Sequence, residues 1–291
     1  MASAEVRLIR RRIKSVQSTM KITRAMELIA ASRIAKAANR VNAAQPYTRK
    51  MTDVIRNIAA AAGGIRHPLL ETREPKNIGV LVVTSDRGLA GAYNTNVIRL
   101  AERMVIDHQK AGREVRIYAV GRKAQAYFKY RNYSIERTFL GVTDTPSYAD
   151  ARSIANTVMN DYSEGTIDVV EAYTTKYRSA MTQDAVLWPL LPIEPPDVSS
   201  SEGIVSYTFE PSPEGIVTTL LPRYVEAVIF GILLEASASE HANRQRAMKA
   251  ATENAEELTR VLTRQANQAR QAEITTEISE IVGGAEALTQ G

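Results

Sequence analysis

The chain begins with a stretch of more than fifty residues that contains almost no helix breaker. From Ala4 to Ala60 there is no glycine and a single proline, Pro46. Small and apolar side chains recur along this stretch at spacings of three and four that average 3.5, which is the period of a coiled coil. The stripe runs through Ile9, Ile13, Val16, Met20, Thr23, Met26, Ala30, Ile34, Ala37, Val41 and Ala44. We expect one long helix that Pro46 bends or breaks and that Gly63-Gly64 ends.

Within this stretch, KITRAMELIAASRI at 21–34 is apolar on more than one side. At about 100° per residue, Ile22, Met26 and Ile29 share one side of a helix, whereas Leu28 points elsewhere. An ordinary surface helix buries a single stripe. The segment therefore needs a second partner surface in addition to the one along the stripe.

A second long helix is expected in the C-terminal part of the chain. Residues 212–214, Ser-Pro-Glu, supply a capping hydroxyl, a proline suited to the first helical position and an acid at the positive helix end. From there to Val282 only Pro222 and Gly231 interrupt the pattern, and Gly283-Gly284 is expected to end the helix. A helix of about 70 residues would be about 105 Å long. Such a length indicates a coiled coil or stalk.

The middle of the chain changes to short apolar runs, which predict strands separated by helices. The expected strands are IGVLVVTS (78–85), VRIYAVG (115–121), DVVEAYTT (168–175) and AVLWPLLPI (185–193). The expected helices are 94–110, 122–130 and 148–164. Alternation of strands and helices predicts a mostly parallel sheet covered by helices, which makes this an α/β domain.

The simplest arrangement pairs the two terminal helices as an antiparallel coiled coil. The expected division is 1–60 for the N-terminal helix, 61–211 for the α/β domain and 212–291 for the C-terminal helix, which joins 1–60 in one stalk. Because the C-terminal helix is longer, about 13 residues overhang, or about 20 Å. The overhang carries Ile274, Ile278, Ile281 and Val282, which would need an external apolar sleeve.

Charge and composition limit the classes of function. The net charge is +5, but residues 1–58 carry thirteen Lys or Arg against three acids, and residues 212–291 carry seven against eleven acids. Two arms of opposite charge attract each other as well as outside partners. The chain has no cysteine, which excludes disulfides and thiolate chemistry. No run of 18 uncharged apolar residues and no apolar signal core is present, so we expect a cytoplasmic protein without a membrane span.

The turn SDRGLAGAYN, 85–94, lies between an expected strand and an expected helix, where a phosphate loop would lie. Gly88 and Gly91 form GxxG only, without the third glycine of a dinucleotide fingerprint or the Lys-Ser/Thr of a P-loop. A tight structural turn is favoured, and a nucleotide-binding enzyme with a coiled-coil appendage is the alternative. His67, His108 and His241 are scattered without ligand spacing, so no metal site or cofactor is expected.

The run RLIRRRIK, Arg7 to Lys14, raises nucleic acid as a third possibility, because clustered Arg and Lys grip phosphates. Against this, Ile9 and Ile13 place the apolar stripe through the run, and no aromatic residue is interleaved. The charged flank of a coiled coil, or a contact with an acidic protein surface, is favoured. We therefore expect no nucleic-acid partner.

Both terminal segments resemble the gamma subunit family of F-type ATP synthases. The resemblance rests on SVQSTMKITRAMELIAASRIAKA (15–37), SEHANRQRAMKAATENAEEL (239–258) and ARQAEITTEISEIVGGAEAL (269–288). It extends to SDRGLAGAYN and covers essentially the whole chain in the same order. The resemblance implies a Rossmann-like α/β domain with a mostly parallel sheet, joined to a long antiparallel coiled coil.

The resemblance also implies a mechanical function. The chain would be the central rotor shaft of the H+-transporting ATP synthase, a non-catalytic subunit with the alpha and beta subunits around it. The epsilon subunit and the c-ring would bind the foot, on the cytoplasmic side of the bacterial membrane. Small side chains at 236–239 and Ala242 would allow close approach of helices and give the shaft a slim, smooth surface. Lys21, Arg24 and Arg33 would be available to acidic residues on the parts of beta that push the shaft.

Individual positions take roles from the family pattern. The resemblance assigns contacts with the beta subunit to Met26, Arg244, Gln271, Thr275 and Glu277. It assigns contacts of the foot with the c-ring to Tyr207 and Glu210. Ala266 departs from the pattern, where many relatives have an aromatic residue, and Phe209 stands where tyrosine is frequent.

Overall fold

The computed structural model describes residues 4–61, 67–193 and 213–289. They form two compact units: a helix unit, Met1–Ile29 with Gln245–Gly291, and an α/β unit, Ala30–Arg244. The long helices α1 (Ala4–Ala61) and α5 (Pro213–Thr289) contribute to both units. The unit boundaries therefore fall inside the two helices, whereas the sequence suggested division at the helix ends.

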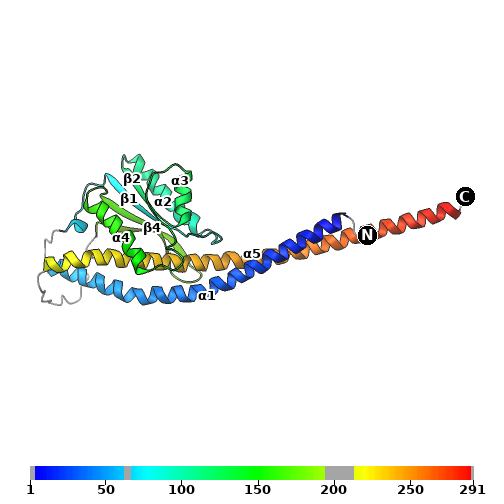
Figure 1. The fold of residues 1–291 in the computed structure, drawn as a ribbon, viewed down its shortest axis with the longest axis horizontal. Coiled ribbons are helices and arrows are strands. Elements are labelled where there is room, and N and C mark those ends of the chain that lie inside the picture. Colours follow the sequence, from blue (N-terminus) through cyan, green and yellow to red (C-terminus); the bar gives the residue numbers. More distant parts are fainter. Residues whose placement is uncertain (1–3, 62–66, 194–212, 290–291) are drawn as a thin grey trace. The chain divides into compact units, whose positions relative to one another are not determined.

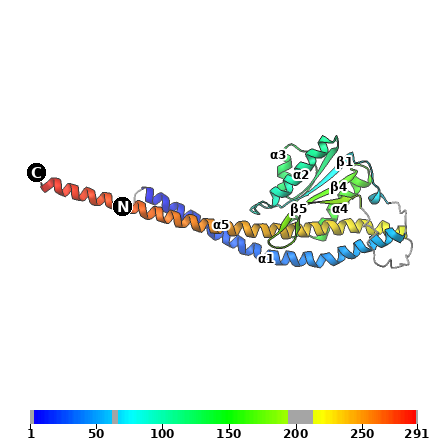
Figure 2. The ribbon, with the colours of Figure 1, turned by 180° about the vertical axis from the view of Figure 1, so that it is seen from behind.

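The α/β unit is built on a five-stranded sheet of order β3-β2-β1-β4-β5 (Figure 1). Neighbouring strands from β3 to β4 run parallel, and β5 pairs antiparallel with β4 at one edge (Figure 2). The mostly parallel sheet expected from the sequence is thus confirmed. The strands are β1 (Asn77–Val83), β2 (Glu114–Val120), β3 (Ile135–Phe139), β4 (Val169–Tyr177) and β5 (Gln183–Leu191).

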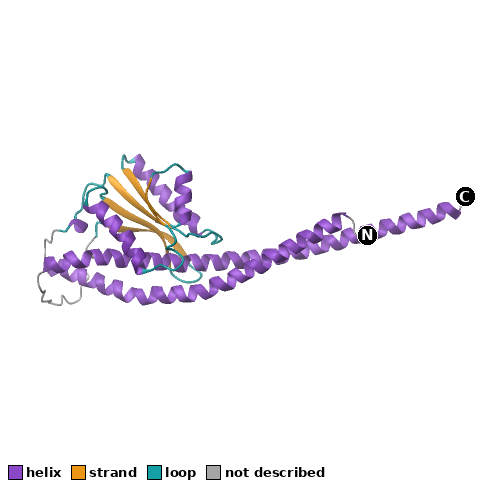
Figure 3. Ribbon diagram, in the orientation of Figure 1, coloured by secondary structure: helices purple, strands orange, loops and turns teal. Residues whose placement is uncertain are grey.

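Helices cover both faces of this sheet, so its central strands are buried on both sides and read as continuous apolar runs (Figure 3). On one face, alternate β1 residues such as Val80 pack against α2 and α3 in one cluster with Val97 and Phe128. The helices are α2 (Tyr93–Lys110), α3 (Arg122–Tyr130) and α4 (Tyr148–Ser163), with a short 3-10 turn at Pro68–Leu70.

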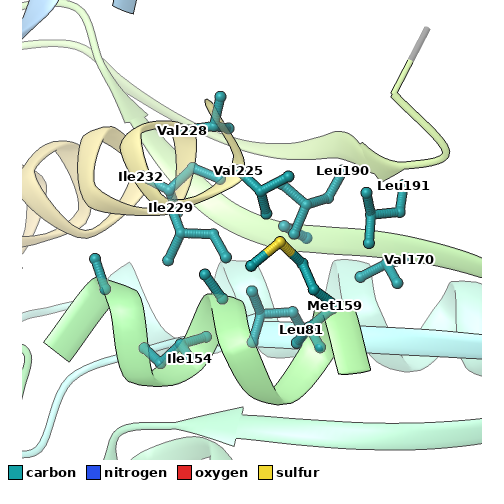
Figure 4. Close-up of a cluster of buried hydrophobic side chains, with 14 of the residues drawn as sticks. Leu81, Ile154, Met159, Val170, Leu190, Leu191, Val225, Val228, Ile229 and Ile232 are labelled. Atoms are coloured by element: carbon teal, nitrogen blue, oxygen red, sulfur yellow. The ribbon is translucent and has the colours of Figure 1, made fainter. Parts of the chain in front are cut away.

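The other face of the sheet packs against α4 and the first part of α5. Leu81 of β1 shares a cluster with Ile154 of α4 and Val225 and Ile229 of α5 (Figure 4). Helix α4 begins with a capping box, in which Ser147 accepts from the Asp150 backbone N–H and the Asp150 carboxylate accepts in return. This second cluster anchors α5 to the α/β unit over several turns.

Helix α1 follows the predicted stripe in both units. Every stripe residue from Ile9 to Ala44 is buried or half-buried, and Thr23, Ala30 and Val41 are at most 9% exposed. Within the α/β unit, Ala37 and Val41 of α1 form a small cluster with Leu234 and Ala238 of α5. The 3.5-residue period therefore identified the packed side of α1 correctly.

Two local expectations were wrong, and a third, the bend or break at Pro46, was wrong as to the break. Strand β3 was not foreseen, because IERTF is short, lies at the sheet edge and has three polar residues in the middle. Helix α1 is not broken at Pro46, and α5 continues through Gly283-Gly284 to Thr289. A helical glycine keeps its N–H donor and costs only about 1 kcal/mol, so it weakens a helix without ending it. The Gly63-Gly64 pair lies outside the described residues.

Helix α5 also contains a window long and apolar enough, by composition alone, to cross a membrane. Half of that window is buried inside the chain. Apolar residues of α5 such as Val225 and Leu233 belong to the core beneath the sheet, and Glu226 forms a hydrogen bond with Tyr148 of α4. The apolar character of this segment is therefore accounted for by packing within the α/β unit.

Candidate interaction surfaces

In the helix unit, polar pairs fix the register between α1 and α5. The hydroxyls of Thr23 and Thr252 are 2.8 Å apart and buried, and Arg24 lies 3.7 Å from Glu256 at the surface. The two helices run antiparallel (Figure 1). Counting outward from the Thr23–Thr252 pair in opposite directions along the two helices therefore places Ala4, the first described residue of α1, level with Gln271 of α5. Beyond that level, α5 continues to Thr289.

The end of α5 carries an apolar face, which we call the terminal face. Its members and their exposed fractions are Ile274 (46%), Ile278 (56%), Ile281 (71%) and Val282 (52%). The face of α5 that packs on α1, which we call the seam, has Leu262 and Ala266 as its last buried residues, at 5% and 8% exposure. At 100° per residue the terminal face lies roughly 120° round the helix from that seam. It is therefore a separate surface and not a continuation of the coiled coil.

The polar residues assigned to beta contacts in this region are exposed. Gln271 and Thr275 lie on the flank of the terminal face, one turn apart, and the Thr275 hydroxyl donates to the Gln271 carbonyl at 2.9 Å. Glu277 is also exposed, but it lies on the other flank. The structure thus brings Gln271 and Thr275 together beside the apolar surface and separates them from Glu277.

On α1, Met26 is half-buried, whereas its apolar neighbours are more exposed. Ile22 is 59%, Leu28 67% and Ile29 55% exposed. The segment is therefore apolar on the seam and also on surfaces that nothing in the described helix unit covers. The family pattern pointed to Met26 and missed Ile22 and Leu28, although both lie in the same two-sided sequence run.

Arg244 does not point outward as expected of a beta contact. Its side chain is 8% exposed, and Nη2 lies 2.5 Å from Glu240 Oε1 and 3.2 Å from the Gly88 carbonyl oxygen. Burial raises the pKa of Glu240, while the charge of Arg244 opposes that rise. Burial likewise raises the pKa of Tyr93, whose hydroxyl is buried near this pair and has no hydrogen-bond partner. Arg244 thus joins α5 to the turn after β1.

Arg33 also forms an ion pair inside the α/β unit, so its guanidinium is not available to acidic residues of a partner subunit. Its Nη1 donates to both carboxylate oxygens of Asp144, at 2.6 and 2.7 Å. Burial alone would raise the pKa of Asp144, but the hydrogen bonds and charge of Arg33 lower it below its usual value. His241 lies 3.8 Å from the same carboxylate, and burial lowers the pKa of His241. A partly buried polar cluster therefore connects α1, α5 and the loop before α4.

The small residues of α5 are buried as well. Ala236, Ser237, Ala238, Ser239 and Ala242 are each at most 3% exposed. They allow α5 to approach its neighbours closely within the α/β unit, as Ala238 does in its cluster with Ala37. The close approach of helices expected of these residues is thus confirmed, whereas the expectation that they form a smooth surface of the shaft was wrong, because they are buried.

The turn 85–94 is closed by the chain's own groups. The Asp86 carboxylate accepts from the backbone N–H groups of Arg122, at the start of α3, and of Gly141, at 3.2 and 3.0 Å. It therefore ties the turn to the N-terminus of α3 and places a negative charge beside it, and within the turn the Asn94 side-chain oxygen accepts from the Ser85 backbone N–H at 2.8 Å. A Cβ at Gly121, which has φ +87°, would lie 2.4 Å from the Thr84 carbonyl oxygen. This geometry favours the structural turn over the nucleotide site.

Two further sequence-based expectations complete the survey. Among the described residues, no group of three or more His, Cys, Asp or Glu is placed to hold a metal ion. Tyr207 and Glu210, expected to contact a c-ring, lie outside the described residues. Four basic residues of α1 border one open surface depression: Arg7, Arg10, Arg11 and Lys14.

The chain is similar to known proteins along nearly its whole length. The family model described as ATP synthase matches residues 5–288. The ATP synthase gamma chain of Parafrankia sp. (strain EAN1pec) is 48% identical over 300 residues, covering 99% of both chains. The ATP synthase gamma chain of Streptomyces coelicolor is 46% identical, covering 98% of this chain and 96% of the relative.

Solved structures share the fold at low sequence identity. A chain of the Euglena gracilis mitochondrial ATP synthase, in the assembly titled OSCP/F1/c-ring, superposes with a TM-score of 0.64 at 17% identity. The match covers 98% of this chain and 94% of that one. The family match and the near-full-length identity to curated relatives show that the chain belongs to the ATP synthase gamma chain family, and hence that it is a subunit of an ATP synthase.

Proposed function

We propose that the chain is the central rotor shaft of an H+-transporting ATP synthase. It couples proton-driven rotation of the c-ring to conformational cycling of the catalytic beta subunits. Its partners are the alpha and beta subunits, which form a hexameric ring, the epsilon subunit and the c-ring. Support comes from relatives named ATP synthase gamma chain and from structures of similar fold titled as central stalk/c-ring and rotor assemblies.

The observation that carries the proposal is the terminal face of α5. Its four aliphatic side chains are about half exposed or more, and they point away from the α1 seam. Burying such a surface is favourable at about 25 cal/mol per Å². An apolar sleeve formed by a ring of subunits would supply that burial without requiring directional bonds, which suits a shaft that must turn inside it.

In this proposal the chain is a non-catalytic subunit, and ATP chemistry belongs to its partners. The anchoring of the 85–94 turn through the Asp86 carboxylate, whose negative charge would repel a phosphate, supports this view over a nucleotide-binding enzyme. The basic run of α1 would face acidic protein surfaces, in preference to nucleic acid. The chain would be peripheral to the membrane, on its cytoplasmic side, and attached through the c-ring.

Met26, Gln271, Thr275 and Glu277 remain candidates for contact with beta, and exposure of the last three is consistent with that role. Tyr207 and Glu210 remain candidates for contact with the c-ring. Arg244 needs a different role, because its guanidinium already satisfies Glu240 and a backbone carbonyl. We propose that it holds α5 to the turn after β1, and so acts on the partner surface indirectly.

Expression of variant chains within the complete ATP synthase of the same organism, assayed in membrane vesicles and after purification, tests the proposal. Ile278→Glu places a charge in the proposed sleeve, where desolvation costs several kcal/mol. We expect coupled ATP synthesis to fall at least tenfold and recovery of the chain with alpha and beta to fall with it. The matched control is Thr276→Glu, on the acidic side of the same helix with Glu273 and Glu280, and it should stay within twofold of the unmodified complex.

The outcomes separate the three candidate functions. Equal activity of the two variants would exclude an apolar sleeve around the terminal face. Saturable micromolar binding of ATP, GTP or NAD by the chain alone would favour the nucleotide-binding alternative. Binding to nucleic acid that weakens steeply with salt would favour the third.

A further inference from the structure

A cavity of about 220 Å³ lies inside the α/β unit, between α1, α5 and the β4–β5 ladder. Its floor is one face of that ladder, and its walls are successive turns of the two helices. Most of the lining is apolar, and the rim carries the exposed side chains of Gln45, Arg49 and Trp188. The apolar lining comprises Val41, Ala44, Val186, Trp188, Val228, Gly231, Ile232 and Leu234.

One buried hydroxyl that lines this cavity has no partner. Thr174 of β4 is 3% exposed, and its Oγ1 forms no hydrogen bond within the described structure. Leaving a buried hydroxyl unsatisfied costs roughly 1 to 3 kcal/mol. The adjacent Thr175 is equally buried, but strand alternation turns its side chain to the opposite face of the sheet. The cavity therefore contains a hydrogen-bonding group that an occupant would satisfy.

Gly231 opens the cavity on the α5 side. It lies in the interior of a 77-residue helix, where glycine costs about 1 kcal/mol relative to alanine. Apart from its chain neighbours and the backbone of its own helix, no atom of the described structure lies within 4 Å of the position that a Cβ would take. Packing inside the chain thus gives no reason for glycine here. Close approach of a bound molecule to the helix backbone would give one.

The polar side of the cavity has both signs of charge. Glu235 accepts a hydrogen bond from the Tyr177 backbone N–H at 3.3 Å, and burial raises its pKa. Lys176 lies nearby, with Nζ 5.8 Å from the centre of the Trp188 ring. A cationic ligand would meet Lys176, together with Arg49 at the exposed rim, and an anionic ligand would meet Glu235 inside the cavity. This arrangement favours an uncharged ligand.

We propose that this cavity binds a small neutral molecule with an aromatic body and one hydroxyl group, of the phenol class. The ring packs against Val228, Ile232 and Trp188, and the hydroxyl bonds with Thr174, whose own hydroxyl is otherwise unpaired in the described structure. An engineered cavity of about 150 Å³ accommodates benzene, so this one has room for a substituted ring. A cluster of waters, at about 30 Å³ each, would face mostly apolar walls. The bound molecule would bridge α1, α5 and the sheet, which goes beyond the shaft function.

Methyl NMR on the full-length chain, labelled at Val, Leu and Ile methyl groups, tests the proposal with phenol as the probe. We expect saturable, millimolar shifts at Val186, Val228 and Ile232. Toluene, which has nearly the same shape but no hydroxyl, should bind at least fivefold more weakly. Absence of saturable shifts with phenol, or equal binding of toluene, would overturn the proposed ligand class.

Three variants locate the site. Gly231→Leu fills the cavity and should abolish phenol binding, while methyl signals of the α2–α3 face of the sheet keep their positions and so report an intact fold. Thr174→Val should reduce phenol binding to the level of toluene. Thr175→Val, which removes an equally buried hydroxyl from the other face, should leave it unchanged. Binding that survives Gly231→Leu, or that Thr175→Val weakens as much as Thr174→Val does, would place the probe elsewhere.

Discussion

Arg244 and Glu240 illustrate how a single residue's surroundings decide its role. One helical turn apart, they form an ion pair in which Arg244 is 8% and Glu240 1% exposed. The sequence pattern located Arg244 as a special position, but not the side to which it points. Helix periodicity shows which residues share a face, whereas the partner of an arginine depends on loops that come from distant parts of the chain, here the turn containing Gly88.

Removing Arg244 should destabilise the chain strongly. Arg244→Met leaves the Glu240 carboxylate buried without its cation, so we expect the free energy of unfolding to fall by about 3 kcal/mol. The double variant Glu240→Leu with Arg244→Met should recover most of that loss, because an apolar pair leaves no uncompensated charge. Denaturant unfolding of the three chains measures both effects.

The matched control for this pair lies further along α5. Arg260 and Glu257 are 3.1 Å apart but 74% and 63% exposed at their side chains. Arg260→Met should therefore cost less than about 1 kcal/mol. Similar losses of unfolding free energy for Arg244→Met and Arg260→Met would show that burial does not determine how strongly each ion pair affects stability.

His241 should make the stability of the chain depend on pH. Burial lowers its pKa from the ordinary 6.5, so between the folded and unfolded values the unfolded chain binds more protons. Stability therefore falls as the pH decreases below about 6.5. We expect His241→Gln to flatten the slope of unfolding free energy against pH between about 6.5 and 5. An unchanged slope would mean that His241 is not the group responsible.

At the scale of elements, the long helices were the most predictable part of the fold. Their packing depends on a period that persists over many turns, so a misplaced residue such as Pro46 hardly alters the pattern. Strand β3 was missed because an edge strand with polar side chains carries little apolar signal. The sequence predicts too early an end for α5, because Gly283-Gly284 resembles a helix stop, whereas glycine only weakens a helix.

The hydrogen bond between Thr23 and Thr252 should help to fix the register of α1 against α5 in the helix unit. Thr23→Val removes one partner of a buried hydrogen bond and should cost about 1 kcal/mol. Changing both residues to Val should cost less than the two single changes together, because each single change already removes the contact between the two hydroxyls, which can be lost only once. A double-mutant cycle on unfolding free energies measures this coupling. Strictly additive effects would show that the 2.8 Å contact contributes nothing specific.

At the scale of the whole molecule, the chain exposes more apolar surface than a self-sufficient protein needs. Exposed aliphatic residues occur on α1, at Ile22 and Leu28, and on the terminal face of α5. Large exposed apolar patches mark surfaces that meet other proteins. The sequence indicated this need through the two-sided run at 21–34, but it could not say which of those residues the chain itself would cover.

The isolated chain should therefore self-associate as its concentration rises. Changing Ile278 and Ile281 together to Glu removes the most exposed part of the terminal face and should shift the sedimentation profile toward monomer. The same change should leave the helix content by circular dichroism within a few per cent, because both positions are exposed. A monodisperse unmodified chain at about 100 μM would contradict the inference that this surface needs a partner.

The angle on α5 between the seam that packs on α1 and the terminal face has a consequence for how such a helix can evolve. Both stripes lie on one continuous helix, so the number of residues between them sets the relative direction in which they point. Deleting one residue between Ala266 and Ile274 would keep the composition nearly constant, yet it would turn the terminal face by about 100° relative to the seam. A substitution alters one position of one stripe, whereas a change in spacing redirects the whole end of the shaft at once.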